Sequence, residues 1–562
     1  MEETERVKTQ QIQLETFWPV LVWLLFGLTV LLRLVNLSQI PISESEANLA
    51  LLSARVAQGQ TGVASVLPVY TGVTTVLFFV FGNADFWVRI LPIAAGSSLI
   101  FLPTLWRDRL GFKKVLALSV AFALVPAITY FSRTIASPIF ATAALLWLIS
   151  LIRLRRWAWA GVVTACLWLS GSFALPLSIL AILGFLIAGQ ETSKVAQFAQ
   201  ELRIEKYGLI RFGSSLLITL ILISTSFFLN PSGLGDIGSF LTSSFDILRS
   251  WQPTELIRFA FLLLQYCLVP LFLFAWNWLN IGSRTNETRP HRMVWLEVAT
   301  FALVFAIFNA GFLLPFSIII WSMGINNFNG RGKLLERKGT IYLPLVVFGV
   351  ALFVYVSIVA KTWANATYNT TGLGLAILAG LLLYAFAHGF VGLGWSSSLA
   401  KRAALTSLGV VLIAGTLAGT FRLVLAAPEK SALHWQNSSV FTDTVLNTLL
   451  NEFKESAKFE AGELLFRADT LPNAPYEWLT RNLTALRPQQ REDKPQVIIT
   501  ATDTPGSGIE SNYRGMVFTG NEKIDWANID LKSFVAGIFG TDMPTVKNQD
   551  YLWVDNSFYS GN

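Results

Sequence analysis

The sequence is poor in charge, in cysteine and in histidine. Only 14% of its 562 residues are charged, against roughly a quarter in an ordinary soluble protein, so most of the chain is not a soluble globular domain. Cys166 and Cys267 both lie in apolar runs, which leaves neither a disulfide framework nor a cysteine-based metal cluster. His291, His388 and His434 are scattered along the chain and form no ligand set, so we expect no metal and no other cofactor.

Hydrophobic residues, in contrast, make up 53% of the chain and gather in long runs. Runs such as Phe17–Val35 and Ile341–Ala360 approach or reach the roughly 20 residues that a helix needs to cross a bilayer. They lack the strict alternation of a membrane β-barrel. The sequence therefore predicts an α-helical polytopic membrane protein with about thirteen spans, near residues 17–35, 87–106, 115–131, 136–152, 158–173, 174–189, 209–229, 256–279, 294–309, 311–325, 341–360, 372–391 and 404–426.

The basic residues predict how these spans are oriented. They cluster in alternate loops, and the positive-inside rule makes those loops cytoplasmic. This alternation needs the stretches 158–189 and 294–325 to be pairs of spans, with turns near Ser172 and Gly311. The formal net charge of +7 is then a signal of topology, and no nucleic-acid partner is expected. The clusters are Arg107/Arg109/Lys113/Lys114, Arg153/Arg155/Arg156, Lys194/Arg203/Lys206/Arg211, Arg284/Arg289/Arg292, Arg331/Lys333/Arg337/Lys338 and Lys401/Arg402.

The expected organisation follows from this orientation. A cytoplasmic tail (1–16) precedes the transmembrane domain (17–427), and an extracytoplasmic domain (428–562) ends the chain. We expect the protein to lie in the plasma membrane or a bacterial inner membrane, with lipid as an obligatory neighbour. After residue 427 the composition turns polar, and short strand-like runs alternate with helical ones, at 441–458 and 476–486. This pattern is typical of a small α/β domain.

The first outer loop (36–86) is long and apolar. Ser43 and Glu46 have the spacing of a capping box, in which a helix N-cap side chain and the side chain three residues later bond each other's backbone. Leu49, Leu52 and Val56 follow at helical spacing, so a helix is predicted along the membrane surface. The stretch Val66–Val80 is too short for a confident span and predicts an interfacial or re-entrant element.

Ionisable residues predicted at the outer face are the first candidates for chemistry. Each has a purely structural interpretation as well. A glutamate at a helix start favours the helix N-terminus, arginines near the ends of spans extend to the headgroups, and a glutamate and an arginine three apart form a helix-surface pair. Their predicted location on one face favours a shared site. The candidates are Glu44, Glu46, Arg89, Tyr130, Arg133, Glu255 and Arg258.

Three stretches resemble the GT-C superfamily, whose members are membrane glycosyltransferases that use polyprenyl-phosphate sugars. They include protein O-mannosyltransferases and aminoarabinose transferases. The likeness is carried by the opening of the first outer loop from Arg33 to Gly59, by Phe86–Arg109 and by Val125–Arg133. It covers roughly the first 190 residues well, and it is plausible in the C-terminal domain.

The resemblance implies transfer of a sugar from a lipid donor to an acceptor at the outer face of the membrane. A carboxylate in the first outer loop would act as general base on the acceptor hydroxyl, and cations would face the lipid phosphate. By position, Glu46 and Glu44 are the base candidates. Arg133 and Arg89 would face the phosphate.

Two departures from the family pattern open an alternative. Members usually carry an Asp-Glu pair where this chain has Ser45-Glu46, and they often carry an acid where it has Ser137-Pro138. One hypothesis is therefore an active transferase, and the other is a GT-C-fold protein that has lost transfer activity and serves as a lipid-binding or assembly subunit. A secondary transporter fits less well, because charges near the midplane are nearly absent and internal repeats are not evident.

Overall fold

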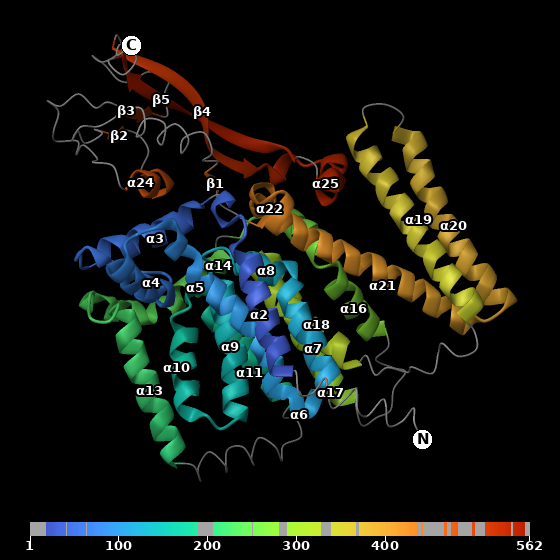
Figure 1. Cartoon of the computed structure of the whole chain (residues 1–562), viewed down its shortest axis with the longest axis horizontal. Helices are drawn as coiled ribbons and strands as arrows, with labels where there is room; N and C mark the ends of the chain where they lie inside the picture. Colours follow the sequence, from blue (N-terminus) through green and yellow to red (C-terminus); the bar gives the residue numbers. More distant parts are fainter. Residues whose placement is uncertain are drawn as a thin grey trace.

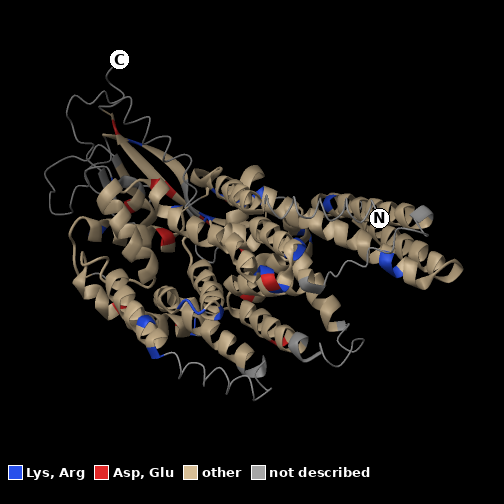
Figure 2. Ribbon diagram, turned by 60° about the horizontal axis from the view of Figure 1, so that its bottom comes forward, with Lys and Arg blue, Asp and Glu red and all other residues tan. Residues whose placement is uncertain are grey.

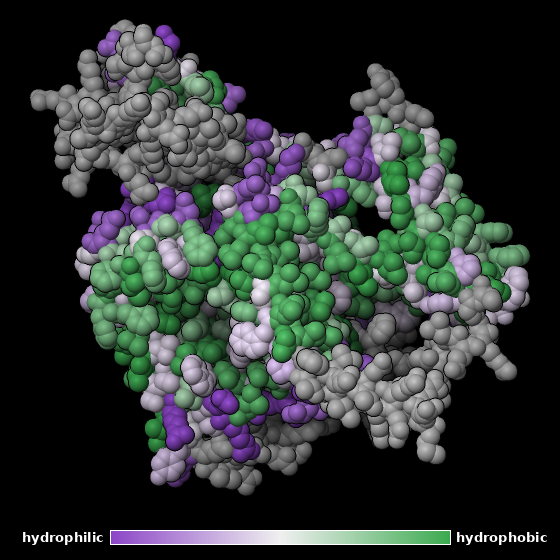
Figure 3. Space-filling model, viewed as in Figure 1, coloured by the Kyte–Doolittle hydropathy of each residue, from purple (hydrophilic) through white to green (hydrophobic). Residues whose placement is uncertain are grey.

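A computed structural model shows a body of helices with a β-sheet at one end (Figure 1). Apolar side chains cover much of the helical body in Figure 3, and charged residues form only short patches along the ribbon in Figure 2. The chain is an integral membrane protein of the α-helical class. The structure describes residues 18–40, 42–62, 64–188, 206–249, 251–279, 289–327, 339–366, 370–435, 440–441, 466–468, 474–481, 497–500, 512–540 and 543–556.

The helical body contains both long and short helices. The segment predicted as the first outer loop lies under the sheet and comprises η1 (Leu37–Gln39), α3 (Glu44–Ala57) and α4 (Pro68–Phe81). The other helices are α2 (Trp18–Leu34), α5 (Asp85–Ser98), η2 (Leu99–Trp106), α6 (Arg107–Leu110), α7 (Phe112–Leu124), α8 (Pro126–Phe131), α9 (Ser137–Arg153), α10 (Trp157–Trp168), η3 (Gly171–Phe173), α11 (Ala174–Ala188), α13 (Lys206–Ser224), η4 (Pro231–Gly238), α14 (Ser239–Arg249), α15 (Thr254–Tyr266), α16 (Leu268–Leu279), α17 (Arg289–Phe308), η6 (Ala310–Phe312), α18 (Leu313–Asn327), α19 (Gly339–Asn365), α20 (Thr370–Gly394), α21 (Ser397–Phe421), η8 (Arg422–Ala426) and α22 (Pro428–Trp435).

Among the described residues, six helices are long and apolar enough to cross a membrane, or up to eight if each of two bent helix pairs is one span. The first pair bends by 112° around 168–171, and the second, α15 with α16, bends by 92° at Cys267. The stretches 158–189 and 294–325 each contain a break, near Gly171 and Gly311, close to where turns are predicted. The count of thirteen spans and the side on which each terminus lies stay predictions.

Prolines explain why several predicted spans are not continuous α-helices. Proline has no backbone N–H, so it leaves the carbonyl four residues earlier without its helical partner. Pro270 does this just beyond the break between α15 and α16, and Pro103 lies inside the 3₁₀ segment η2. Val125, which precedes Pro126, is extended rather than helical and separates α7 from α8.

The C-terminal part contains a five-stranded mixed sheet in the order β1-β4-β5-β3-β2. Its centre is the antiparallel pair β4 (Tyr513–Ile524) and β5 (Thr545–Asp555), with Met516 opposite Leu552. The strands β3 (Val497–Thr500) and β2 (Phe466–Ala468) are parallel, and β1 (Val440–Phe441) pairs with β4. Of the predicted helices, 441–458 begins in β1 and otherwise lies outside the described residues, and 476–486 overlaps α24 (Ala474–Thr480).

Two helices dock this sheet-bearing part onto the helical body (Figure 1). On one side α24 lies against α3, and its Trp478 stacks on Phe78 of α4 and donates a 2.9 Å hydrogen bond to Asp85 at the start of α5. On the other side α25 (Leu531–Ile538) lies against α15 and α19, and Arg422 of η8 donates to the carbonyl oxygens at its end. There the Gln265 amide donates to the Gly537 carbonyl at 3.1 Å. The region between these two contacts is where polar residues from both parts meet.

Candidate active site

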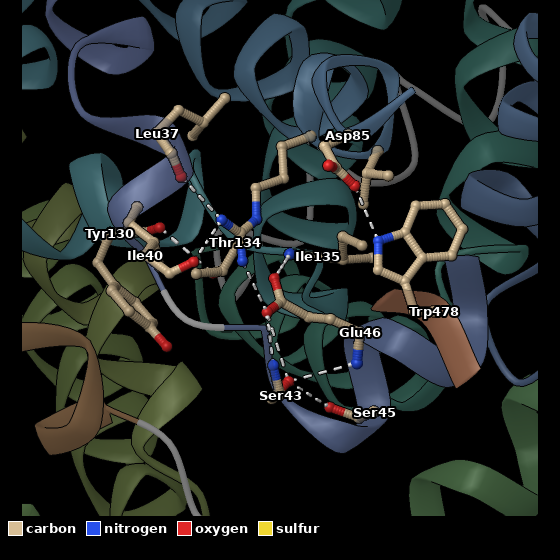
Figure 4. Close-up of polar contacts among 12 residues, drawn as sticks. Leu37, Ile40, Ser43, Ser45, Glu46, Asp85, Tyr130, Thr134, Ile135 and Trp478 are labelled. Carbon is tan, nitrogen blue, oxygen red and sulfur yellow. Dashed lines mark hydrogen bonds and ion pairs between the residues drawn. The ribbon is translucent and has the colours of Figure 1, made fainter. Parts of the chain in front are cut away.

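The start of α3 is shaped by the predicted capping box, which the structure confirms. The Ser43 side chain accepts a hydrogen bond from the Glu46 N–H, and the Ser43 N–H donates to the Glu46 carboxylate at 3.1 Å. This reciprocal pairing satisfies two backbone donors that a helix N-terminus otherwise leaves unpaired. It fixes the direction in which the Glu46 side chain leaves the helix, which is into the protein (Figure 4).

Glu46 is only 2% exposed, and both of its carboxylate oxygens have partners. Oε2 accepts from Ser43 and from the Arg89 guanidinium at 3.2 Å. Oε1 accepts from the backbone N–H of Ile135 at 2.7 Å. A buried charge is tolerated when it is paired and hydrogen-bonded in this way. The four residues Ser43, Glu46, Arg89 and Ile135 are called the Glu46 network below.

Arg89 extends the network to the chain that precedes α3. Its Nη1 donates to the carbonyl oxygens of Leu37 at 3.0 Å and Ile40 at 2.9 Å, which are the beginning and the end of the η1 turn. The side chain is buried among these groups and does not extend along the protein surface. Arg89 therefore holds the segment before α3 against α5, and it forms an ion pair with Glu46.

Arg133 follows α8 and is 1% exposed. Its two terminal nitrogens donate to the backbone carbonyls of Val35 and Leu423, so it joins the end of α2 to η8. Burial, together with the nearby charge of Arg89, lowers the pKa of Arg133 to about 10, and the group stays charged at neutral pH. Among the described residues, the Arg133 Nε donor has no hydrogen-bond partner although it is buried.

Glu44 and Ser45 lie on the exposed side of the first turn of α3. The Ser45 hydroxyl lies 3.1 Å from that of Ser43, so the serine that stands where GT-C members usually carry an aspartate contacts the N-cap of α3. At the second departure from the family pattern, Ser137-Pro138, the serine makes contacts that hold helices together. The Ser137 hydroxyl donates to the Ser170 carbonyl and accepts from the Phe173 N–H at 3.1 Å, which ties α9 to the break between α10 and α11.

The side chains of Tyr130 and Arg258 both contact the last turn of α22, and Glu255 pairs with Arg258. The Tyr130 ring stacks on Trp435 with centroids 5.1 Å apart. Arg258 pairs with Glu255 at 3.0 Å and donates to the carbonyl oxygens of His434 and Trp435. The predicted i, i+3 pair is therefore present, and its arginine anchors the end of α22.

The structure thus divides the predicted residues into two neighbouring groups. Glu46 and Arg89 share one network, and Arg133 adjoins it through the segment that ends at Ile135. Tyr130, Glu255 and Arg258 surround Trp435. The residues that the sequence does not reveal are mostly backbone groups, such as the Ile135 N–H, because any residue type can supply them. No group of three or more metal-ligating side chains occurs among the described residues.

Comparisons with known proteins bear on the fold. No protein-family model matches the sequence, and no curated protein sequence matches it. A crystal structure of ArnT from Cupriavidus metallidurans bound to undecaprenyl phosphate matches at a TM-score of 0.51 and 13% identity, covering 97% of this chain and 99% of that one. The fold is that of ArnT. The apo structure of the same protein matches at a TM-score of 0.46 and 15% identity, over 83% and 85% of the two chains.

The likeness to the lipid-bound structure covers 97% of this chain, which is more than the sequence resemblance covers. The likeness of fold therefore includes the stretches whose motifs resemble the GT-C superfamily. At 13% identity the likeness does not reach individual side chains. The catalytic and binding roles of Glu44, Glu46 and the arginines therefore stay predictions.

Proposed function

We propose that the chain is a membrane glycosyltransferase that moves a sugar from a polyprenyl-phosphate donor to an acceptor hydroxyl at the outer face of the membrane. The observation that carries the proposal is the match to ArnT over nearly the full length of both chains, because that ArnT structure is bound to undecaprenyl phosphate. The resemblance of the opening motifs to GT-C transferases supports the same assignment independently of the fold.

The contacts around α3 support different roles for the two glutamates. Glu46 has both oxygens engaged by donors, so it is a positioning residue that fixes the α3 N-terminus. Glu44 lies two residues before Glu46, about 200° around the helix axis from it, on the exposed side where a substrate can reach it. We assign Glu44 as the general base, which must come within hydrogen-bond reach of the proton that it takes.

The proposed step balances without a cofactor. The acceptor oxygen attacks C1 of the sugar, the bond from C1 to the phosphate oxygen breaks, and the lipid phosphate leaves with the electron pair. The acceptor proton passes to Glu44. Arg133 supports this scheme because its buried Nε–H has no partner among the described residues and suits an anionic oxygen.

The test is release of undecaprenyl phosphate from lipid-linked sugars by the purified full-length chain in nanodiscs. We expect Glu44→Gln to lower the rate at least a hundredfold, the lower range for a lost general base. Asp108→Asn, an equivalent change on exposed α6 at the opposite end of the helical body from the sheet, should leave it unchanged. Full activity in Glu44→Gln would refute the assignment of the base.

A second candidate function is a non-catalytic GT-C subunit that binds the lipid or assists a membrane complex. The engagement of Glu46 by four donor groups and the serine at position 45 favour it. The same assay separates the two functions. Binding of undecaprenyl phosphate without turnover of any lipid-linked sugar would favour the subunit, and turnover that depends on Glu44 would exclude it.

A further inference from the structure

A cavity of about 320 Å³ lies where α22 and η8 meet the C-terminal sheet. Its walls come from both parts of the molecule: Arg422, Glu429 and His434 on the body side, Glu522 and Thr545 on the sheet side. In Figure 3 hydrophilic side chains gather along this junction, above the apolar surface of the helices. None of the candidate residues from the sequence lines it. It is called the α22 cavity below.

The cavity is held open by contacts that fix α25. Arg422 donates to the carbonyl oxygens of Ile538 at 3.1 Å and Phe539 at 2.8 Å, which end that helix. A cation at these carbonyls is the favourable arrangement at a helix C-terminus. Gly540 follows with a φ of +80°, and a Cβ there would lie 2.7 Å from the Arg422 guanidinium carbon. Arg422 and the end of α25 are therefore closely packed and hydrogen-bonded in this wall of the cavity.

One lining group is a buried acceptor without a partner. The Gln265 side chain donates from Nε2 to the Gly537 carbonyl at 3.1 Å, and its Oε1 has no hydrogen-bond partner among the described residues. Because a carbonyl oxygen only accepts, the amide nitrogen must face Gly537, and this fixes the direction of Oε1. A buried acceptor without a partner costs folding free energy. A ligand hydroxyl would satisfy it.

The other polar groups of the cavity offer both donors and acceptors. The pKa of His434 is lowered to about 3 by burial and by the charge of Arg422, so its ring is neutral at pH 7. Glu429 is an exposed carboxylate, Thr545 brings a hydroxyl, and Lys547 pairs with Glu522 at 3.5 Å. Charges of both signs line the walls beside apolar side chains such as those of Leu433 and Met543. This mixture suits a neutral ligand with many hydroxyls better than a strongly charged one.

We propose that the α22 cavity binds a saccharide through its hydroxyl groups. The volume lies at the lower end of the range of small-molecule sites, which fits a single sugar unit. The inference deepens the proposed function, on which it rests for the role of the sugar. The sugar comes either from the lipid-linked donor or from an acceptor glycan, and the binding chemistry is the same.

The test measures binding of methyl glycosides of mannose, glucose, galactose and N-acetylglucosamine to the full-length chain in nanodiscs by saturation-transfer NMR. Thr545→Tyr puts a bulky ring into the cavity and should weaken binding at least tenfold. Val546→Tyr is the matched control, because the next residue on β5 points to the other face and does not line the cavity. It should bind as the wild type does.

A second variant keeps the inference testable if Thr545→Tyr fails to fold. Glu429→Ala removes an exposed lining carboxylate, and we expect about threefold weaker binding. Unchanged affinity in both variants overturns the proposal. Failure of every glycoside to bind the wild type overturns it too, since the cavity then holds only water.

A competition arm identifies the source of the sugar and separates this inference from the proposed function. Displacement of the glycoside by undecaprenyl-phosphate-linked sugar, but not by undecaprenyl phosphate, assigns the cavity to the donor sugar. Simultaneous binding assigns it to an acceptor glycan. If undecaprenyl phosphate does not bind the protein at all while glycosides do, the cavity inference stands and the proposed function fails.

Discussion

The Glu46 network and the α22 cavity are both polar clusters that join distant segments, and they differ in how fully their buried groups are paired. In the Glu46 network both carboxylate oxygens are matched by donors within 3.4 Å. In the α22 cavity the Oε1 acceptor of Gln265 has no partner among the described residues. The first cluster is arranged for stability, and the second for a ligand.

This difference separates two kinds of buried polar site. A network in which every group is paired stabilises the fold, because removing one member leaves another charge buried without a partner. A cluster with an unpaired buried group has a free-energy cost, which is removed only when another group hydrogen-bonds to it. Carboxylates and arginines at the outer face of a membrane protein are therefore not sufficient to locate chemistry. What indicates a binding site is whether such a group still has a hydrogen-bonding atom without a partner in the protein.

The largest expected effect comes from opening the Glu46 network. Arg89→Met leaves the Glu46 carboxylate buried beside a thioether, and we expect a loss of about 3–5 kcal/mol in folding free energy. The ion pair involved is nearly inaccessible, with side chains 8% and 2% exposed. The measurement is the unfolding temperature in nanodiscs. Adding Glu46→Gln to Arg89→Met should restore part of the loss, because the buried charge is then removed.

An exposed ion pair provides the control. Arg55 contacts Glu477 between α3 and α24, with side chains 43% and 54% exposed. Solvent screens such pairs, so Arg55→Met should cost no more than about 1 kcal/mol. Equal losses in Arg89→Met and Arg55→Met would mean that the Glu46 network does not hold the first outer loop.

The sequence predicted the parts of the site that depend on neighbours in the chain. The capping box at Ser43 and Glu46 and the pair of Glu255 with Arg258 are set by spacings of three residues, and both are present. The apolar runs predicted a helical membrane protein for the same reason, because length and hydropathy are local properties. The sequence did not predict the contacts between segments that lie far apart in the chain.

Those contacts had no signal in the residue types. The Ile135 N–H reaches Glu46 across 89 positions, and Arg133 reaches the Leu423 carbonyl across 290. Backbone groups are the same for every residue, so the pairing depends on the packed fold alone. The α22 cavity was missed for a related reason: Gln265 and Thr545 are ordinary polar residues until packing brings them together.

The second expected effect is a pH dependence that belongs to the cavity. The folded-state pKa of His434, about 3, lies below its ordinary value of 6.5 because of burial and Arg422. A depressed pKa gives stability that is present above pH 6.5 and is lost as pH falls toward 3. Between pH 7.5 and pH 5 the loss is about 2 kcal/mol.

The measurement is the unfolding temperature of the wild type and of His434→Gln across that range. The glutamine keeps a polar group toward Tyr266, whose hydroxyl lies 3.0 Å from the His434 ring nitrogen Nδ1, and it removes the titration. The wild type should lose stability on acidification, and the variant should lose clearly less. Parallel curves for the two proteins would rule out a buried neutral histidine at the junction.

The smallest effect tests the wall of the cavity itself. Arg422→Lys keeps the positive charge at the end of α25 but cannot reproduce a planar guanidinium that donates to two carbonyls, so we expect a loss of about 1 kcal/mol. Hydrogen exchange should rise in 531–540 and stay unchanged in α3. Arg402→Lys, on the exposed start of α21, is the matched control and should alter neither. If exchange rises equally in α3 and α25, the two docking contacts of the sheet open together, and the α22 cavity is not an independent site.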